Sequence, residues 1–196
     1  MTQLFWLILG LAIFLGGHAV TRMTGLRARL AAQFGSNVYR ALYSLWAVMG
    51  LAMIVHGYAV YRAAGYIVVW SPPKFLSHLA ILLIWPAMIM LVAAYAPGNI
   101  KAKLKHPMLV GIKAWAFGHL LANGDLGSIL LFGSFLGWAV FTRIALKKSG
   151  ADAALPAPPE RSIALRNDAI AVIGGTIIAL ALVFGLHMRL IGVSVL

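Results

Sequence analysis

The chain has 196 residues, of which 62% are hydrophobic and only 10% charged, and its mean hydropathy is +0.93. Soluble domains carry about 25% charged residues, so the composition excludes a water-soluble globule. The net charge of +12 does not indicate a nucleic-acid partner, because basic loops beside membrane spans set orientation and meet anionic lipid headgroups.

The apolar pattern predicts an all-α fold, a polytopic membrane bundle of about six transmembrane helices, since a span needs roughly 20 apolar residues. Residues 1–3 include no basic residue, and the apolar run that follows reaches Val20 without a convincing cleavage site. The first run is therefore predicted to be a retained span and not a signal peptide. Spans and short connections use almost the whole chain, so residues 1–196 are predicted as a single domain. The predicted spans are 4–20, 38–61, 75–95, 107–123, 126–146 and 169–187.

Proline and glycine mark the boundaries between these spans. The fourth and fifth are separated only by Asn-Gly-Asp at 123–125, which is typical of a helical-hairpin turn. Ser-Pro-Pro at 71–73 precedes the third span, and Pro-Gly at 97–98 ends it. The longest polar stretch, 147–166, contains three prolines and is predicted to be a flexible surface linker without a chemical role.

Lysine and arginine are distributed unevenly over the predicted loops. Loops one, three and five share one side of the membrane and contain Arg22, Arg27, Arg29, Arg40, Lys101, Lys103, Lys105, Arg143, Lys147, Lys148, Arg161 and Arg166. The other side contains only Arg62, Lys74 and Arg189. The positive-inside rule therefore predicts that both termini face away from the cytoplasm.

Histidine is the residue type that must carry any metal chemistry, because the chain has no cysteine. The six histidines, His18, His56, His78, His106, His119 and His187, lie in or beside predicted spans. Ionisable groups there usually face the bundle interior. Paired intramembrane imidazoles favour haem b, whose iron takes axial nitrogens from facing helices. A proton relay would use the same residues, whereas the shortage of carboxylates argues against a non-haem metal site.

His119 is the strongest single candidate. It lies about 21 Å of helix rise beyond Lys105, too deep for an interfacial residue. Asn123, four positions on, is near enough to orient the imidazole or to line the same cavity. His18 follows Gly16 and Gly17, small residues that let another helix or a flat macrocycle approach the backbone.

The other ionisable groups are weaker candidates. His106 precedes a proline that suits the first helical turn, and Lys113 returns to within about 20° of the same face. Lys113 is predicted to neutralise a haem propionate or an acidic headgroup, or else to snorkel. His56 is a possible second ligand, and His78 and His187 are predicted to be interfacial and structural.

Two segments of the fourth span, Lys-His-Pro-Met-Leu-Val-Gly at 105–111 and His-Leu-Leu-Ala-Asn-Gly-Asp at 119–125, resemble the NnrU family. Gly-His at 17–18, Tyr-Arg at 39–40 and His-Gly-Tyr at 56–58 extend the resemblance. It implies a bacterial inner-membrane protein linked to denitrification and nitrogen-oxide metabolism. It also implies kinship with zeta-carotene isomerase, a haem b enzyme of plants and cyanobacteria.

The resemblance implies His18 and His119 as haem-iron ligands, with His106 in the His-Pro motif and His56 as a further matching histidine. Ala116 stands where the isomerase has a cysteine, so ligand exchange with a thiol is not expected. Depth along the helices favours another pairing. His18 lies only about 6 Å of helix rise from the basic residue Arg22, whereas His119 lies about 21 Å from Lys105. By depth alone His119 pairs with His56, and His18 with His106. Both pairings stay open.

Three functions follow as hypotheses. The first is a haem b protein that handles an apolar polyene such as a carotenoid, by cis–trans isomerisation, or a small ligand such as nitric oxide. The second is a non-enzymatic membrane accessory of nitrogen-oxide reductases. The third is a methyltransferase, since 105–111 is similar to the Arg-His-Pro-x-Tyr-x-Gly segment of membrane enzymes that bind S-adenosylmethionine. Those enzymes usually carry paired glutamates, whereas Glu160 is the single glutamate here.

Overall fold

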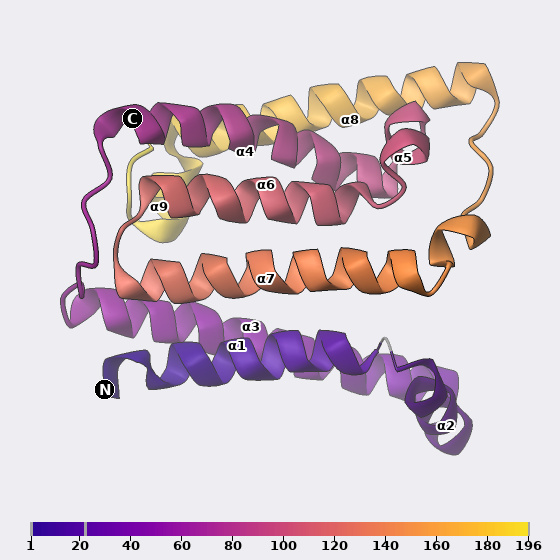
Figure 1. Ribbon diagram of the computed structural model, residues 1–196, viewed down its shortest axis with the longest axis horizontal. Coiled ribbons are helices and arrows are strands. Elements are labelled where there is room, and N and C mark those ends of the chain that lie inside the picture. Colours follow the sequence, from indigo (N-terminus) through magenta and orange to yellow (C-terminus); the bar gives the residue numbers. More distant parts are fainter. Residues whose placement is uncertain (1, 22, 196) are drawn as a thin grey trace. The chain divides into compact units, whose positions relative to one another are not determined.

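The computed structural model describes residues 2–21 and 23–195, and these form an all-α structure (Figure 1). The elements are α1 (Thr2–Val20), α2 (Thr24–Phe34), α3 (Ser36–Ala63), α4 (Lys74–Tyr95), α5 (Asn99–Leu104), α6 (Pro107–Ala122), α7 (Leu126–Lys148), the 3-10 turn η1 (Ala151–Ala154), α8 (Arg161–Ala181), the π-helical turn η2 (Leu182–Leu186) and α9 (His187–Ile191). Arg22, one of the cations in the orientation argument, lies outside the described residues. The predicted fold class is confirmed.

Five helices of the described chain are long and apolar enough to cross a membrane: Gln3–Val20, Ser36–Ala63, Lys74–Tyr95, Leu126–Lys148 and Arg161–Ile191. The sixth predicted span is α6, a shorter apolar helix of 16 residues. Large apolar side chains stay exposed along these helices, among them Leu45, Leu82 and Ile173. Such surfaces are unusual in soluble proteins and suit contact with lipid, so the chain is a multi-pass membrane protein.

Three short helical elements occupy segments predicted as loops, namely α2, α5 and η1. The α2 segment is rich in Leu, Arg and Ala, all good helix formers. The linker predicted at 147–166 is narrower in the structure, because α7 continues to Lys148 and α8 begins at Arg161. Helix formation at both ends shortens the polar segment, and Asp152 within it contacts His106 at the beginning of α6.

The chain forms two compact units: Met1–Val69 with Asp125–Ser134 (unit 1), and Trp70–Gly124 with Phe135–Leu196 (unit 2). In unit 1, α1 and α3 run antiparallel in close contact. A Cβ atom at Gly10 would lie 2.6 Å from the Ile54 nitrogen, and one at Gly50 would lie 2.9 Å from the Phe14 nitrogen. One at Gly57 would overlap the Leu7 backbone. Small residues thus set the helix separation, as in many membrane helix pairs.

The start of α7 also belongs to unit 1, where buried Tyr61 anchors it. The Tyr61 hydroxyl accepts a hydrogen bond from the Ile67 amide at 3.0 Å, and the Tyr61 ring fills the space beside Gly127. The Asp125 carboxylate accepts the Ser128 amide at 2.9 Å, which satisfies a donor of the first helical turn.

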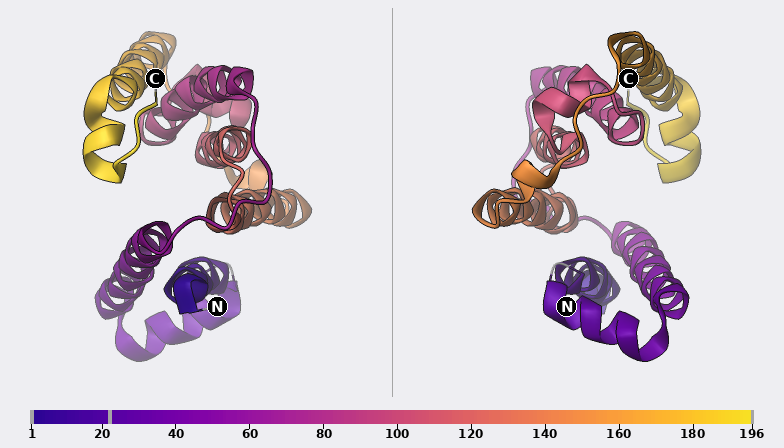
Figure 2. Two further views of the ribbon diagram at one scale, coloured as in Figure 1. Left: turned by 90° about the vertical axis from the view of Figure 1, so that its left-hand side faces the viewer. Right: turned by 90° about the vertical axis from the view of Figure 1, so that its right-hand side faces the viewer.

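In unit 2, α4 packs against both α6 and α8, as the two views of Figure 2 show. Glycines again face the neighbouring helix: a Cβ at Gly111 would lie 2.9 Å from the Ala87 carbonyl oxygen. Gly118 faces Ile84, and Gly175 of α8 faces Ile89. The closely packed α4–α6 pair is what positions the candidate residues of α6.

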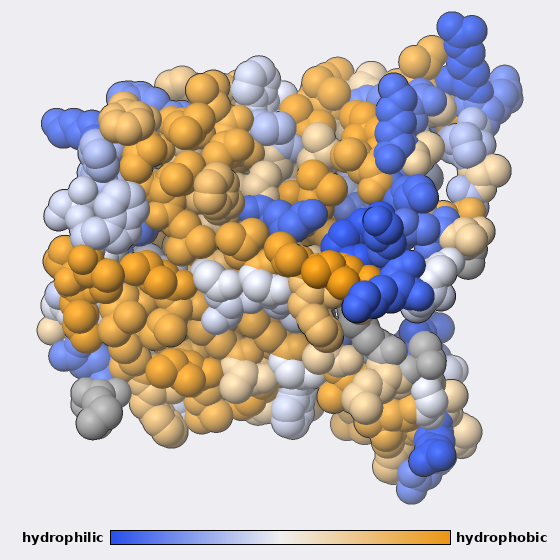
Figure 3. Space-filling model, viewed as in Figure 1, coloured by the Kyte–Doolittle hydropathy of each residue, from blue (hydrophilic) through white to orange (hydrophobic). Residues whose placement is uncertain are grey.

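The polar end of unit 2 is organised by Asp168 of α8. Its carboxylate accepts the Asn99 amide at 3.1 Å, the Asn99 side-chain amide at 2.9 Å and the Ile100 amide at 3.0 Å. These bonds hold the first turn of α5 against α8. In Figure 3 the hydrophilic surface of unit 2 gathers toward this end, where α5 carries Lys101 and Lys103.

Candidate functional site

His119 lies on the last turn of α6 and is held by its own helix. Its Nδ1 donates to the Trp115 carbonyl oxygen at 2.9 Å, and the Trp115 ring lies beside it with centroids 5.2 Å apart. Asn123 was predicted to orient the imidazole, but its side-chain amide donates to the His119 backbone carbonyl at 2.8 Å. Asn123 therefore caps the helix end and fixes the backbone of His119.

His187 lies beside His119, with ring centroids 6.4 Å apart and an interplanar angle of 32°. The sequence interpretation treated His187 as an interfacial, structural residue. What it missed is the kink at Gly185, whose φ of 145° interrupts the last helix before α9 begins. L-residues rarely adopt that φ, so Gly185 is the local signal for the change of direction.

His18 lies near the end of α1 in unit 1, with its Nδ1 donating to the Phe14 carbonyl at 2.7 Å. Its ring contacts those of Phe14 and Tyr43, at centroid distances of 4.4 and 5.6 Å. The predicted close approach at Gly17 is made by Trp46 of α3, which would lie 2.7 Å from a Cβ there. Ligation of one iron by His18 and His119 stays a prediction.

The imidazoles of His18, His119 and His187 share one feature: each directs Nδ1 at a backbone carbonyl. A carbonyl oxygen only accepts hydrogen bonds, so Nδ1 carries the proton and Nε2 carries the lone pair of the neutral ring. Metal-bound histidines characteristically donate their other ring N–H to such a carbonyl. The three imidazoles thus have the tautomer that an Nε2 metal ligand requires.

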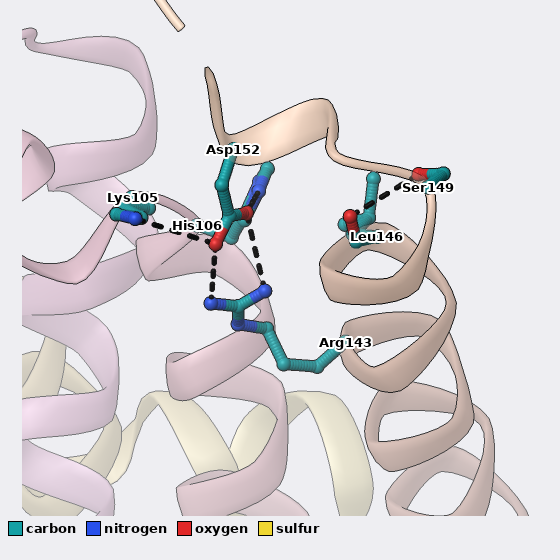
Figure 4. A network of polar contacts seen from close by, with 6 residues as sticks. All are labelled: Lys105, His106, Arg143, Leu146, Ser149 and Asp152. Atoms are coloured by element: carbon teal, nitrogen blue, oxygen red, sulfur yellow. Dashed lines mark hydrogen bonds and ion pairs between the residues drawn. The ribbon is translucent and has the colours of Figure 1, made fainter. Parts of the chain in front are cut away.

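His106 has different partners. Its Nε2 lies 3.0 Å from Asp152 Oδ1, and Arg143 donates two hydrogen bonds to the same carboxylate at 3.2 and 2.8 Å (Figure 4). Lys105 Nζ lies 3.4 Å from Asp152 Oδ2. Asp152 belongs to η1, inside the segment predicted to have no chemical role. The Asp152 carboxylate therefore joins the segment after α7 to the beginning of α6.

The surrounding cations hold the pKa of the Asp152 carboxyl at about 2, below its usual 3.8, chiefly through the hydrogen bonds from Arg143. His106 and Lys105 lower that pKa further. A depressed carboxyl pKa stabilises the folded state at pH values above the unfolded pKa. This contribution is lost as the pH falls from about 4 toward 2.

We expect Asp152→Asn to lower the melting temperature at pH 5 to 7, and the difference from wild type to disappear as the pH falls toward 2. Thermal denaturation of the detergent-purified protein, followed by circular dichroism across this range, measures it. Glu160→Gln is the control, because the exposed Glu160 carboxylate accepts a single hydrogen bond, from Ser162, among the residues that the structure describes. If the difference in melting temperature between Asp152→Asn and wild type persisted unchanged at pH 2, the effect could not be assigned to the charge of Asp152.

The remaining candidates lie apart from these contacts. Lys113 is half-buried on α6 and has no carboxylate within ion-pair distance among the residues that the structure describes. His56 is exposed on α3, where its ring contacts Trp6 at 6.1 Å between centroids. His78 is exposed on α4.

Within residues 2–21 and 23–195, no group of three or more His, Cys, Asp or Glu side chains is placed to hold a metal ion. Haem iron needs fewer ligands from the protein, since the porphyrin supplies the equatorial ligands and the protein supplies one or two axial ones. The residues of α6 and α9 meet that need, because two imidazoles with proton-bearing Nδ1 atoms lie side by side.

The NnrU protein family matches the chain over residues 6–195. No curated protein matches the chain significantly. The same holds for solved structures. The match covers both units and every candidate residue.

Proposed function

Because this chain belongs to the NnrU protein family, we propose that it is a haem b protein of the bacterial inner membrane that acts in nitrogen-oxide metabolism. His119 would hold the haem iron through Nε2. The observation that carries the proposal is the hydrogen bond of 2.9 Å from His119 Nδ1 to the Trp115 carbonyl, which leaves the lone pair on Nε2. The family resemblance names His18 as the opposite ligand.

When bound, haem b would supply a redox-active iron that can take a small ligand such as nitric oxide. The chain orients His119 through Trp115 and fixes the helix backbone through Asn123. Lys113, about 9 Å of helix rise from His119, provides a positive charge for a haem propionate. A charge without a carboxylate partner is costly inside a membrane, and a propionate offsets that cost.

An apolar polyene is the larger ligand that we propose. Unit 1 contains an open apolar cavity of about 340 Å³ between α1, α2 and α3. Gly16, Gly17 and Tyr43 line it together with Trp46, and the Tyr43 ring contacts His18. This size accommodates a segment of an extended hydrocarbon chain, and the aromatic lining suits conjugated double bonds.

The basic end of unit 2 is the part that we propose to meet anionic lipid headgroups on the cytoplasmic side. Lys101, Lys103, Lys147 and Lys148 lie there, at α5 and the end of α7. Each Lys near an anionic surface contributes about 1 kcal/mol of attraction. The positive-inside rule, applied to the loops of the whole sequence, accordingly predicts both termini in the periplasm.

The test is the absorption spectrum of detergent-purified protein from haem-replete cells, oxidised and dithionite-reduced. We expect a Soret band with sharp reduced α and β bands, and their loss in His119→Ala. His78→Ala is the matched control, an exposed histidine of the same unit. A colourless wild-type protein, or an unchanged spectrum in His119→Ala, would overturn the proposal in favour of a non-enzymatic accessory of nitrogen-oxide reductases.

A further inference from the structure

We propose that His119 and His187 form a two-imidazole metal site within unit 2, with His187 as the ligand opposite His119. The inference deepens the proposed function, on which its haem form rests. Neither the sequence interpretation, which made His187 a structural residue, nor the family resemblance assigns it a role as a metal ligand. Four observations carry it: the kink that places His187, the anchoring of both rings, their separation, and their surroundings.

The first observation is the kink. The helix that contains α8 ends in the π-helical turn η2, where Gly185 adopts a φ of 145°. The chain then forms α9, which begins at His187 and lies beside the C-terminal end of α6 (Figure 1). A straight continuation of α8 would not require a glycine at this position.

The second observation is that both imidazoles are anchored on the same ring atom. His119 Nδ1 donates to Trp115, and His187 Nδ1 donates to the Val193 carbonyl at 2.8 Å. The second bond is made possible by the turn at Gly192, which brings Val193 back toward His187. Both rings therefore have a fixed tautomer and orientation, and both carry the lone pair on Nε2.

The third observation is the separation of the rings. Metal–imidazole bonds are about 2 Å long, so two ligands on opposite sides of one metal place their nitrogens about 4 Å apart. Ring centroids at 6.4 Å are compatible with this arrangement when the Nε2 atoms face each other.

The fourth observation is the apolar environment of the pair. The Trp115 ring packs against His119 and meets the Phe135 ring edge-on at a centroid distance of 5.6 Å. Trp115 also packs on the cluster of Ala87, Met88 and Ala179. An aromatic and aliphatic wall suits a flat apolar macrocycle. Imidazole is a ligand both for haem iron and for single ions such as copper.

The experiment titrates detergent-purified protein, carrying an affinity tag without histidine, with haemin and separately with Cu²⁺. Absorption and electron paramagnetic resonance spectra are recorded for wild type, His119→Ala, His187→Ala, Gly185→Ala and His18→Ala. His78→Ala is the control. For haemin we expect a low-spin wild type, loss of binding in His119→Ala, and a high-spin spectrum in His187→Ala. The haemin affinity of His187→Ala should fall by more than about tenfold, since even outer-shell partners of a ligand contribute that much.

Three further results test ligation by His187. Added imidazole should restore the low-spin spectrum of His187→Ala, because it replaces the lost ligand without repairing any packing. Gly185→Ala should shift the spectrum in the same direction as His187→Ala, because the kink positions His187. His18→Ala should keep the low-spin spectrum.

A low-spin, wild-type spectrum in His187→Ala overturns the inference and leaves the proposed function standing, with His18 as the ligand to examine. If wild type binds no haemin, the proposed function fails. The pair then stands only if Cu²⁺ gives nitrogen-coupled resonance spectra that are lost in both His119→Ala and His187→Ala. Absence of this dependence overturns the inference as well.

Discussion

A Gly57→Ala variant should be markedly less stable than the wild-type protein. The new Cβ would overlap the backbone of Leu7 and lie 2.6 Å from the Trp6 carbonyl carbon, and backbone atoms cannot move aside as a flexible side chain can. The two helices must separate and lose their closest contact. Overpacking costs about 1–3 kcal/mol, so we expect a fall of at least that size in the free energy of unfolding, measured by titration with SDS.

Gly133→Ala is the matched control, because Gly133 is also a helical glycine of unit 1 and has no neighbouring atom within 4 Å of an added Cβ. Alanine is the better helix former by about 1 kcal/mol. The control should therefore be as stable as wild type or more stable. Equal destabilisation by both substitutions would show that close approach at Gly57 does not determine the packing of α1 on α3.

Asp168→Ala should have the second large effect. It removes the acceptor of two backbone amides and one side-chain amide, those of Asn99 and Ile100. Donors left without a partner cost about 1–3 kcal/mol, and the first turn of α5 would separate from α8. We expect the free energy of unfolding to fall by about 2 to 3 kcal/mol, and protease cleavage to appear in the segment 96–106.

Glu160→Ala provides the comparison, since Glu160 is an exposed carboxylate just before α8 whose hydrogen bond is donated by the nearby Ser162 hydroxyl. It should change stability little. Asp168→Asn should lie between wild type and Asp168→Ala, because its amide keeps one acceptor oxygen but turns a donor toward a backbone amide. Protection of 96–106 from protease in Asp168→Ala would contradict the role assigned to the carboxylate.

The network at Asp152 illustrates the limit of linear patterns. Prolines near Asp152 and the polar composition of 147–166 predict a linker, and the segment between α7 and α8 is indeed irregular except for η1. The partners of Asp152 are evident only in the tertiary structure. There the end of α7 and the beginning of α6 lie side by side, so Arg143 and His106 converge on the Asp152 carboxylate. The one available signal was charge: Asp152 is one of only four acidic residues.

His119 and His187 show the same difference between what the sequence predicts and what the tertiary structure decides. His119 is identifiable from sequence because an ionisable residue deep in an apolar run is unusual. His187 lies at the end of its run, where interfacial histidines are common. Only the φ of Gly185 reveals that the chain turns there and brings His187 to His119.

The sequence by itself determined the all-α membrane fold, the approximate positions of its long apolar helices and the residue types able to bind a metal. These properties depend on hydropathy, on helix-breaking residues and on side-chain chemistry, all of which are local. Tertiary structure alone decided which of those residues meet. A helix fixes the angle of each side chain about its own axis, but the partner across the interface depends on how closely glycines let helices approach and where a kink redirects the chain.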